Sequence, residues 1–199
     1  MLVTEPMERS RLVAVVREAV SGGVNAVQLR DKSSSDLDLL DTALAVKACL
    51  GDCPLLVNRR PSVAVRTDIA GVHLPEQGPG IEAARAIVGA GRLIGRSVHS
   101  SVEAEAAERA GADYLVAGTV FASRSHPGLP PVGIGFVRSV CMAVSLPVIA
   151  IGGVTPENAV QCLASGASGV AVLSAILYAA NPRAAATRYW ERLAAFTGE

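Results

Sequence analysis

The sequence is short of aromatic residues, which make up only 4% of its 199 residues, although half of the residues are hydrophobic. This proportion disfavours an aromatic-cored sandwich and favours an α/β protein with aliphatic strands packed against alanine-rich helices. Neither sign of charge is in excess, since 18 lysines and arginines balance 18 aspartates and glutamates. Without a basic field the chain has no general attraction for nucleic acid or for an anionic membrane. We therefore expect neither as a partner.

The sequence also lacks cysteine pairs with the spacing of a zinc site. We interpret its four cysteines as small apolar residues in a reducing cytoplasm rather than as metal ligands or disulfides. It has no charged-then-apolar signal at the N-terminus, and no apolar run reaches the length of about 18 residues that a membrane helix requires. These absences predict a cytoplasmic protein.

What the sequence does contain is a repeated alternation of short apolar runs and helical periodicity, typical of βα units. Predicted strands lie at residues 2–4, 26–29, 55–57, 72–74, 94–98, 114–117, 148–151 and 170–173. Predicted helices lie near residues 8–21, 35–49, 61–66, 81–89, 101–110, 134–143, 156–165 and 182–195. Eight such units without a reversal or a linker favour a closed barrel over an open doubly wound sheet. We predict an α/β fold, a (βα)8 TIM barrel, with residues 1–199 as a single domain.

Polar residues gather where the predicted strands lead into the following loops, which is where barrel enzymes place their site residues. The candidates for substrate binding are Gln28, Arg30, Lys32, Asn58, Ser97, Thr119, Ser123 and Ser125. Arg30 and Lys32 are two apart, so on an extended strand end they would point together into the mouth of the barrel. The competing interpretation is a solvated pair of charges.

The last two strand-to-helix loops predict a phosphate site. Gly152 and Gly153 follow one strand, where bare backbone N–H groups and a helix start would attract an anion. Ser174 and Ala175 follow the next strand and open a predicted short helix. The glycine pair alone would fit a simple tight turn, but the pairing of the two loops favours phosphate.

Two histidines are candidates for acid/base catalysis. His99 shares a strand face with Ser97, and His126 lies in the long loop 119–133. His73 lies inside an apolar run, which is more typical of a structural role.

Ordered blocks along almost the whole chain resemble the family of thiamin phosphate synthase and thiazole tautomerase. The blocks are residues 27–32, 71–74, 94–100, 111–114, 118–121, 147–153 and 169–176. The resemblance implies a barrel that binds a small-molecule thiazole phosphate on the loops of Gly152-Gly153 and Ser174-Ala175. A homo-oligomer is possible.

The resemblance also implies Mg²⁺ for the synthase, which joins hydroxymethylpyrimidine diphosphate to thiazole phosphate. The two metal carboxylates would fall at Arg59 and around Gly78, where only Glu76 is nearby, and a cation at Arg59 opposes Mg²⁺ binding. The block 94–100 is closer to the tautomerase branch, which moves a proton and needs no metal. The histidine expected in that branch is Thr119 here, and threonine is no proton shuttle at neutral pH.

We therefore predict a metal-independent thiazole tautomerase, an isomerase of a carboxythiazole phosphate, with no metal and no other cofactor. His126 or His99 would move the proton. The alternatives are thiamin phosphate synthase, a transferase that would use Mg²⁺, and a non-catalytic barrel that binds a phosphate ligand.

Overall fold

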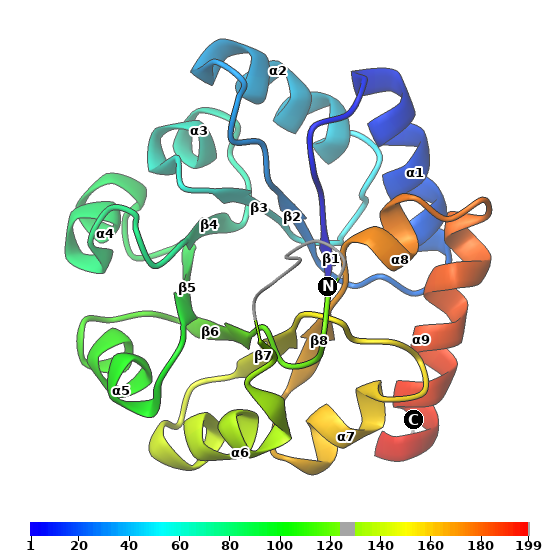
Figure 1. The fold of residues 1–199 in the computed structure, drawn as a ribbon. Coiled ribbons are helices and arrows are strands. Elements are labelled where there is room, and N and C mark those ends of the chain that lie inside the picture. Colours follow the sequence, from blue (N-terminus) through cyan, green and yellow to red (C-terminus); the bar gives the residue numbers. More distant parts are fainter. Residues whose placement is uncertain (124–129, 199) are drawn as a thin grey trace.

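The computed structural model describes residues 1–123 and 130–198, in which eight strands alternate with helices. The strands are β1 (Leu2–Val3), β2 (Val27–Leu29), β3 (Leu55–Asn58), β4 (Gly71–Leu74), β5 (Leu93–Val98), β6 (Tyr114–Gly118), β7 (Val148–Ile151) and β8 (Gly169–Ala171). The helices, which surround the strands in Figure 1, are α1 (Arg9–Ser21), α2 (Asp36–Lys47), α3 (Pro61–Arg66), α4 (Ile81–Val88), α5 (Ser101–Arg109), α6 (Gly133–Ala143), α7 (Ala159–Ala164), α8 (Ser174–Leu177) and α9 (Pro182–Thr197). Within the described ranges no helix is both long and apolar enough to span a membrane.

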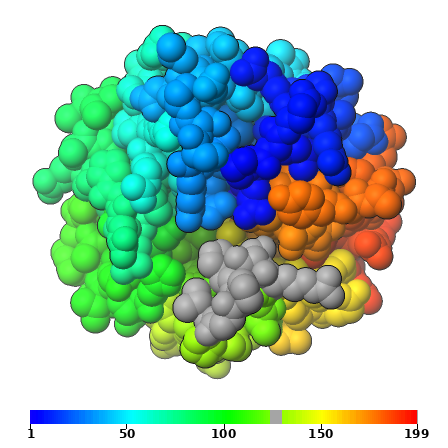
Figure 2. Space-filling view, turned by 45° about the horizontal axis from the view of Figure 1, so that its top comes forward, coloured from blue at the N-terminus to red at the C-terminus, as the bar shows by residue number. Residues whose placement is uncertain are grey.

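All eight strands form one parallel sheet in the order β1 to β8, and the sheet closes on itself. Leu2 and Val172 form a parallel bridge, and the Val3 N–H donates to the Val172 carbonyl oxygen at 2.9 Å. As a result, the N-terminal segment and the segment after β8 lie side by side, blue against orange, in Figure 2. The predicted TIM barrel is therefore confirmed.

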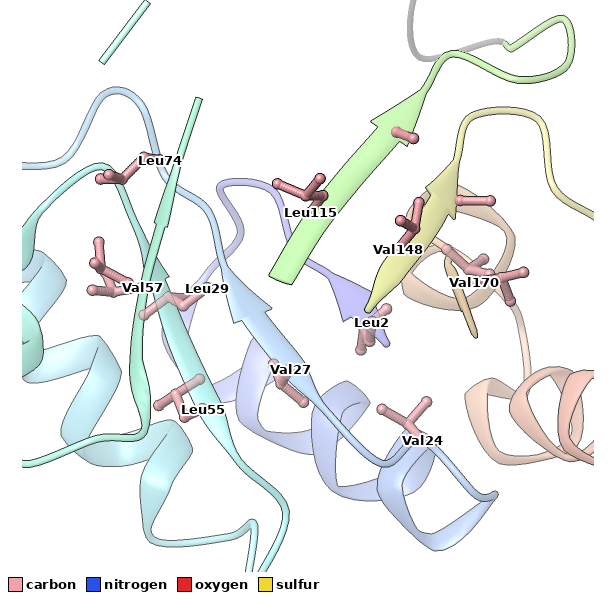
Figure 3. Close-up of a cluster of buried hydrophobic side chains, with 14 of the residues drawn as sticks. Leu2, Val24, Val27, Leu29, Leu55, Val57, Leu74, Leu115, Val148 and Val170 are labelled. Atoms are coloured by element: carbon pink, nitrogen blue, oxygen red, sulfur yellow. The ribbon is translucent and has the colours of Figure 1, made fainter. Parts of the chain in front are cut away.

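Successive residues of the strands face two different hydrophobic clusters. The residues that point toward the helices belong to the main core, and Figure 3 labels several of them: Leu2, Val27, Leu29, Leu55, Val57, Leu74, Leu115, Val148 and Val170. The residues that point into the barrel form a smaller cluster of Leu56, Tyr114 and Val116, with Met1, Ile149 and Ile151 packed against it. Because side chains alternate along a strand, this division fixes which polar residues face the inside of the barrel.

The strand boundaries agree with the sequence prediction to within two residues, but the seventh helix begins later than predicted. α7 starts at Ala159 and not at residue 156. The Thr155 N–H donates to the Asn158 side-chain oxygen at 2.8 Å, which holds the preceding residues in a turn. The predicted short helix after the last strand is present as α8.

A buried polar network crosses the inside of the barrel. The His73 imidazole lies 2.9 Å from the Ser97 hydroxyl through Nε2 and 3.3 Å from the Tyr114 hydroxyl through Nδ1. Gly95 makes room for the Tyr114 ring, since a Cβ atom there would lie 2.0 Å from Tyr114 Cζ. Burial, followed by the charge of Arg96, lowers the pKa of His73 to about 3. The imidazole is therefore neutral at neutral pH and has the structural role that its apolar neighbours predict.

The buried His73 should make the protein less stable in mild acid. Its pKa is about 3 in the fold against an ordinary value of 6.5, so below pH 6.5 the unfolded chain takes up a proton that the folded barrel does not. From pH 7 to pH 5 this residue should lower the free energy of unfolding by about 2 kcal/mol. Urea unfolding at both pH values measures the loss. A His73→Gln variant should be less stable at pH 7 but should lack this part of the pH dependence; an equal pH dependence in both proteins would contradict the assignment.

Candidate active site

The carboxyl ends of the parallel strands open at one rim of the barrel, and the predicted site residues lie at or just beneath this rim. The structure describes Gln28, Arg30, Lys32, Asn58, Ser97, His99, Thr119, Ser123, Gly152, Gly153, Ser174 and Ala175. Ser125 and His126 lie outside the described residues. The described residues of the predicted site thus come from six strand ends and lie at one edge, as the parallel sheet requires.

Two amide side chains form the floor of the mouth between β2 and β3. Gln28 and Asn58 are both buried, and the Gln28 Nε2 donates to the Asn58 Oδ1 at 3.3 Å. Each amide has further donors or acceptors beyond this one bond, and in a buried position these favour a polar partner. The pair therefore suits a ligand with ring nitrogens or amino groups.

Arg30 lies above this floor, and its charge is compensated by an acid that the sequence analysis missed. Its Nη1 lies 3.5 Å from the Glu5 Oε1, and the Tyr178 hydroxyl donates to the other Glu5 oxygen at 3.1 Å. Glu5 follows β1 as Arg30 follows β2, and β1 and β2 are neighbours in the sheet, so strand alternation could have identified the pair.

Lys32 does not share a strand face with Arg30, because β2 ends at Leu29. The Asp31 carboxylate accepts hydrogen bonds from the Ser33 N–H at 2.8 Å and the Ser34 N–H at 3.0 Å, which turns the chain. Lys32 is exposed and has no hydrogen-bond or ion-pair partner among residues 1–123 and 130–198. Its charge therefore remains available to an anion at this edge.

His99 is held at the rim between β5 and β6. Its Nδ1 lies 2.9 Å from the Gly118 carbonyl oxygen, which can only accept, so this nitrogen carries the hydrogen. Its Nε2 lies 3.6 Å from a Glu76 carboxylate oxygen, a contact that is an ion pair only when the ring is protonated. Ser97, two residues before His99 in the sequence, forms a hydrogen bond with His73 instead. The two residues that share a strand face thus belong to different networks.

Gly152 and Gly153 allow the loop after β6 to pack closely against them, whether or not a ligand binds there. Both have positive φ angles, 102° and 62°. A Cβ atom at Gly152 would lie 2.4 Å from Thr119 Cγ2, and one at Gly153 would lie 2.3 Å from the Ala122 carbonyl oxygen. The tight-turn interpretation is therefore correct in itself, but it does not exclude the phosphate site.

Several N–H groups at these two loops remain open to an anion. In the part of the chain that the structure describes, the N–H groups of Gly153, Ser174 and Ala175 have no hydrogen-bond acceptor, and Ser174 and Ala175 are exposed. α7 and α8 have only 6 and 4 residues, so their helix dipoles add little. The site would therefore depend on direct hydrogen bonds to the phosphate oxygens.

The residues at the position of the family's metal site do not fit Mg²⁺. Arg59 stands where the resemblance places one carboxylate, and its Nη2 donates to the Gln77 carbonyl oxygen at 2.6 Å. Glu76 faces His99, as described above. Among the described residues, no group of three or more histidines, cysteines, aspartates or glutamates is arranged to hold a metal ion. At most one carboxylate, that of Glu76, is therefore left at this position to hold Mg²⁺.

A hollow lies at the other end of the barrel. This cavity of about 520 Å³ lies between α9 and the amino end of β8, and its lining includes Leu193, the half-exposed Trp190 and Phe196. None of the predicted site residues lines it. The residues that could bind a substrate or take part in catalysis are at the rim, so we place the candidate active site there.

Comparisons with known proteins give a consistent result. A family model described as thiamine monophosphate synthase matches residues 1–176. The chain is 41% identical over 179 residues to the thiamine-phosphate synthase of Natronomonas pharaonis, covering 87% of this chain and 84% of that protein. It is 40% identical over 181 residues to that of Roseiflexus castenholzii, covering 89% and 79%. A solved structure of thiamine phosphate pyrophosphorylase from Pyrococcus furiosus matches with a TM-score of 0.87 and 32% identity, covering 98% of this chain and 95% of that chain.

These comparisons contradict the prediction of a thiazole tautomerase. That prediction depended on a few rim positions, chiefly Arg59 in place of an acid and the block 94–100. The similarity over the rest of the chain is to proteins named thiamine-phosphate synthase. The isomerase prediction was wrong, and so was the predicted reaction in which His126 or His99 would move a proton.

A carboxylate at Ala175 should repel a phosphate from the β7 and β8 loops. Ala175→Asp should weaken the binding of inorganic phosphate by about tenfold, because it sets a negative charge beside the open N–H groups. Titration calorimetry measures the affinity, and Ala195→Asp, on the exposed face of α9, is the control with the same change of charge. A substitution at Gly153 would be ambiguous, since it would also displace the β6 loop. Equal affinity in the two variants would place the phosphate elsewhere.

Proposed function

The chain belongs to the thiamine monophosphate synthase family, and we propose that it is itself a thiamine-phosphate synthase, a transferase. The observation that carries the proposal is the family match over residues 1–176. The substrates, taken from the family resemblance, are hydroxymethylpyrimidine diphosphate and a thiazole phosphate. The thiazole nitrogen forms a bond to the methylene carbon of the pyrimidine, the bond from that carbon to the diphosphate oxygen breaks, and the diphosphate leaves with the electron pair.

The arrangement of the rim supports a reaction between two anionic substrates. The open N–H groups lie after β7 and β8, whereas Lys32 and Arg59 lie after β2 and β3. In a ring of eight strands β3 and β7 are opposite each other. Two substrates anchored at opposite sides by their phosphates would bring their rings together over the mouth. Holding two reactants in this way is a large part of catalysis for a displacement.

This reaction makes no net demand for a proton carrier. Bond formation and departure of the diphosphate move electron pairs but no proton. The reaction therefore does not need a histidine at position 119, where this chain has a threonine. The buried amides of Gln28 and Asn58 would bind the pyrimidine ring on the floor of the mouth. Thr119, Ser123 and Ser125 stay predicted substrate contacts, and a cytoplasmic location and a homo-oligomer stay predictions as well.

The purified protein should form thiamine phosphate from the two substrates. Liquid chromatography with mass spectrometry follows this product, and an enzymatic phosphate assay follows the diphosphate released in equal amount. The reaction is run both with EDTA and with Mg²⁺. Absence of product in both conditions, with binding of thiazole phosphate intact, would contradict the proposal and favour the non-catalytic barrel.

Removing one amide from the floor should impair the coupling reaction. Asn58→Ala leaves the Gln28 amide buried without its partner and removes a group proposed to orient the pyrimidine, so kcat/KM should fall about 10- to 100-fold. Gln161→Ala removes an exposed amide from α7 and should leave the rate unchanged. Circular dichroism and the unfolding midpoint separate a loss of fold from a loss of catalysis. An Asn58→Ala variant with normal kinetics would exclude the floor from substrate binding.

A further inference from the structure

Arg59 is one of the cations at the rim that have no carboxylate partner among the described residues. Arg30 pairs with Glu5, and Arg60 donates to the Asp36 carboxylate at 2.8 Å, so both have an acidic partner. Arg59 is exposed, and its one described hydrogen bond from the guanidinium goes to the neutral carbonyl of Gln77. Among residues 1–123 and 130–198 it has no carboxylate within ion-pair distance. Its positive charge is therefore not compensated by the described part of the protein.

The contacts of Arg59 hold it at the rim. The Arg59 N–H donates to the His73 carbonyl oxygen at 2.8 Å, and its backbone adopts a φ of 69°. The bond to Gln77 fastens the guanidinium to the loop after β4, at residues 75–80. From the other side, Arg96 donates to the carbonyl oxygens of Glu76 and Pro79 in the same loop. A guanidinium has five N–H groups, so the single bond to Gln77 leaves most of the Arg59 donors free.

The structure thus offers a fixed, uncompensated guanidinium where the family resemblance places a metal carboxylate. On the basis of the proposed synthase function, we propose that Arg59 does the work of the divalent cation. It binds the diphosphate of the pyrimidine substrate and neutralises it as it leaves, so coupling needs no metal. Arginine keeps its charge throughout the physiological pH range, and its planar fork matches two phosphate oxygens.

Charge and topology both support this role. When the carbon–oxygen bond breaks, the leaving diphosphate gains the electron pair, and a cation beside it stabilises the charge that develops. Lys32, also without a partner in the described ranges, adds a positive charge at the neighbouring strand end. Arg59 lies after β3, across the ring from the open N–H groups after β7. The two anions would thus be bound at separate sides of the mouth, with the reacting atoms between them.

The deciding experiment compares the coupling rate in EDTA with the rate in Mg²⁺. The unmodified protein should give rates within about twofold of each other. Arg59→Gln should lose about 100-fold in kcat in EDTA, the usual scale for one group that stabilises developing charge. Arg59→Lys keeps the charge but loses the fork, and should fall between the two. Arg66→Gln, an exposed arginine on α3 without a described partner, is the matched control and should keep the full rate.

The outcomes separate this inference from the function on which it rests. Coupling that requires Mg²⁺, or an Arg59→Gln variant as fast in EDTA as the unmodified protein, would overturn the inference and leave the synthase function standing. If no coupling occurs in either condition, the synthase proposal fails, and binding of inorganic diphosphate in EDTA decides the inference. Calorimetric binding that Arg59→Gln weakens at least about tenfold, and Arg66→Gln does not, would support it; binding that needs Mg²⁺ or is indifferent to Arg59 would overturn it.

Discussion

The pairing of the first strand with the last is the constraint on which the site depends. Leu2 bridges to Val172, and main-chain hydrogen bonds join Val3 and Met1 to the same residue, so the sheet has no free edge. All strands end at the same rim because they are parallel, and closure of the ring makes loops that are far apart in the sequence face each other over one mouth. The open N–H groups after β7 and β8 and the cations after β2 and β3 thereby lie around one mouth, where we propose the active site.

The balance of charge across this rim distinguishes the chain from what the family resemblance implies. Where two carboxylates would hold a metal, the protein has Arg59, while Glu76 is beside His99. The proposed site thus carries positive charge on its own side chain in place of a bound metal ion. Both arrangements would present positive charge to a phosphate group.

Much of the fold could be predicted from the sequence, because apolar periodicity is local. The run 148–151 alternates between the main core and the inside of the barrel, and its predicted bounds are those of β7. Predictions failed where short-range side-chain bonds replaced regular structure: the Thr155–Asn158 bond delays α7, and the Asp31 turn ends the strand before Lys32. The prediction of an isomerase failed for a different reason. It gave a few substituted rim positions more weight than the similarity of the whole chain.

By itself the sequence determined the barrel, and it predicted the rim as the location of the site and the glycine and serine loops after the last strands as the phosphate site. Each follows from the order of residues along one βα unit. Only the tertiary structure decided which charges are paired. Glu5 compensates Arg30, whereas Arg59 bonds to the neutral Gln77 carbonyl and has no carboxylate partner among the described residues. Gln28 meets Asn58 beneath them. These contacts join the ends of different strands. Which side chains meet there depends on the register of the strands and on the side-chain rotamers, and the spacing of residues in the sequence does not encode either.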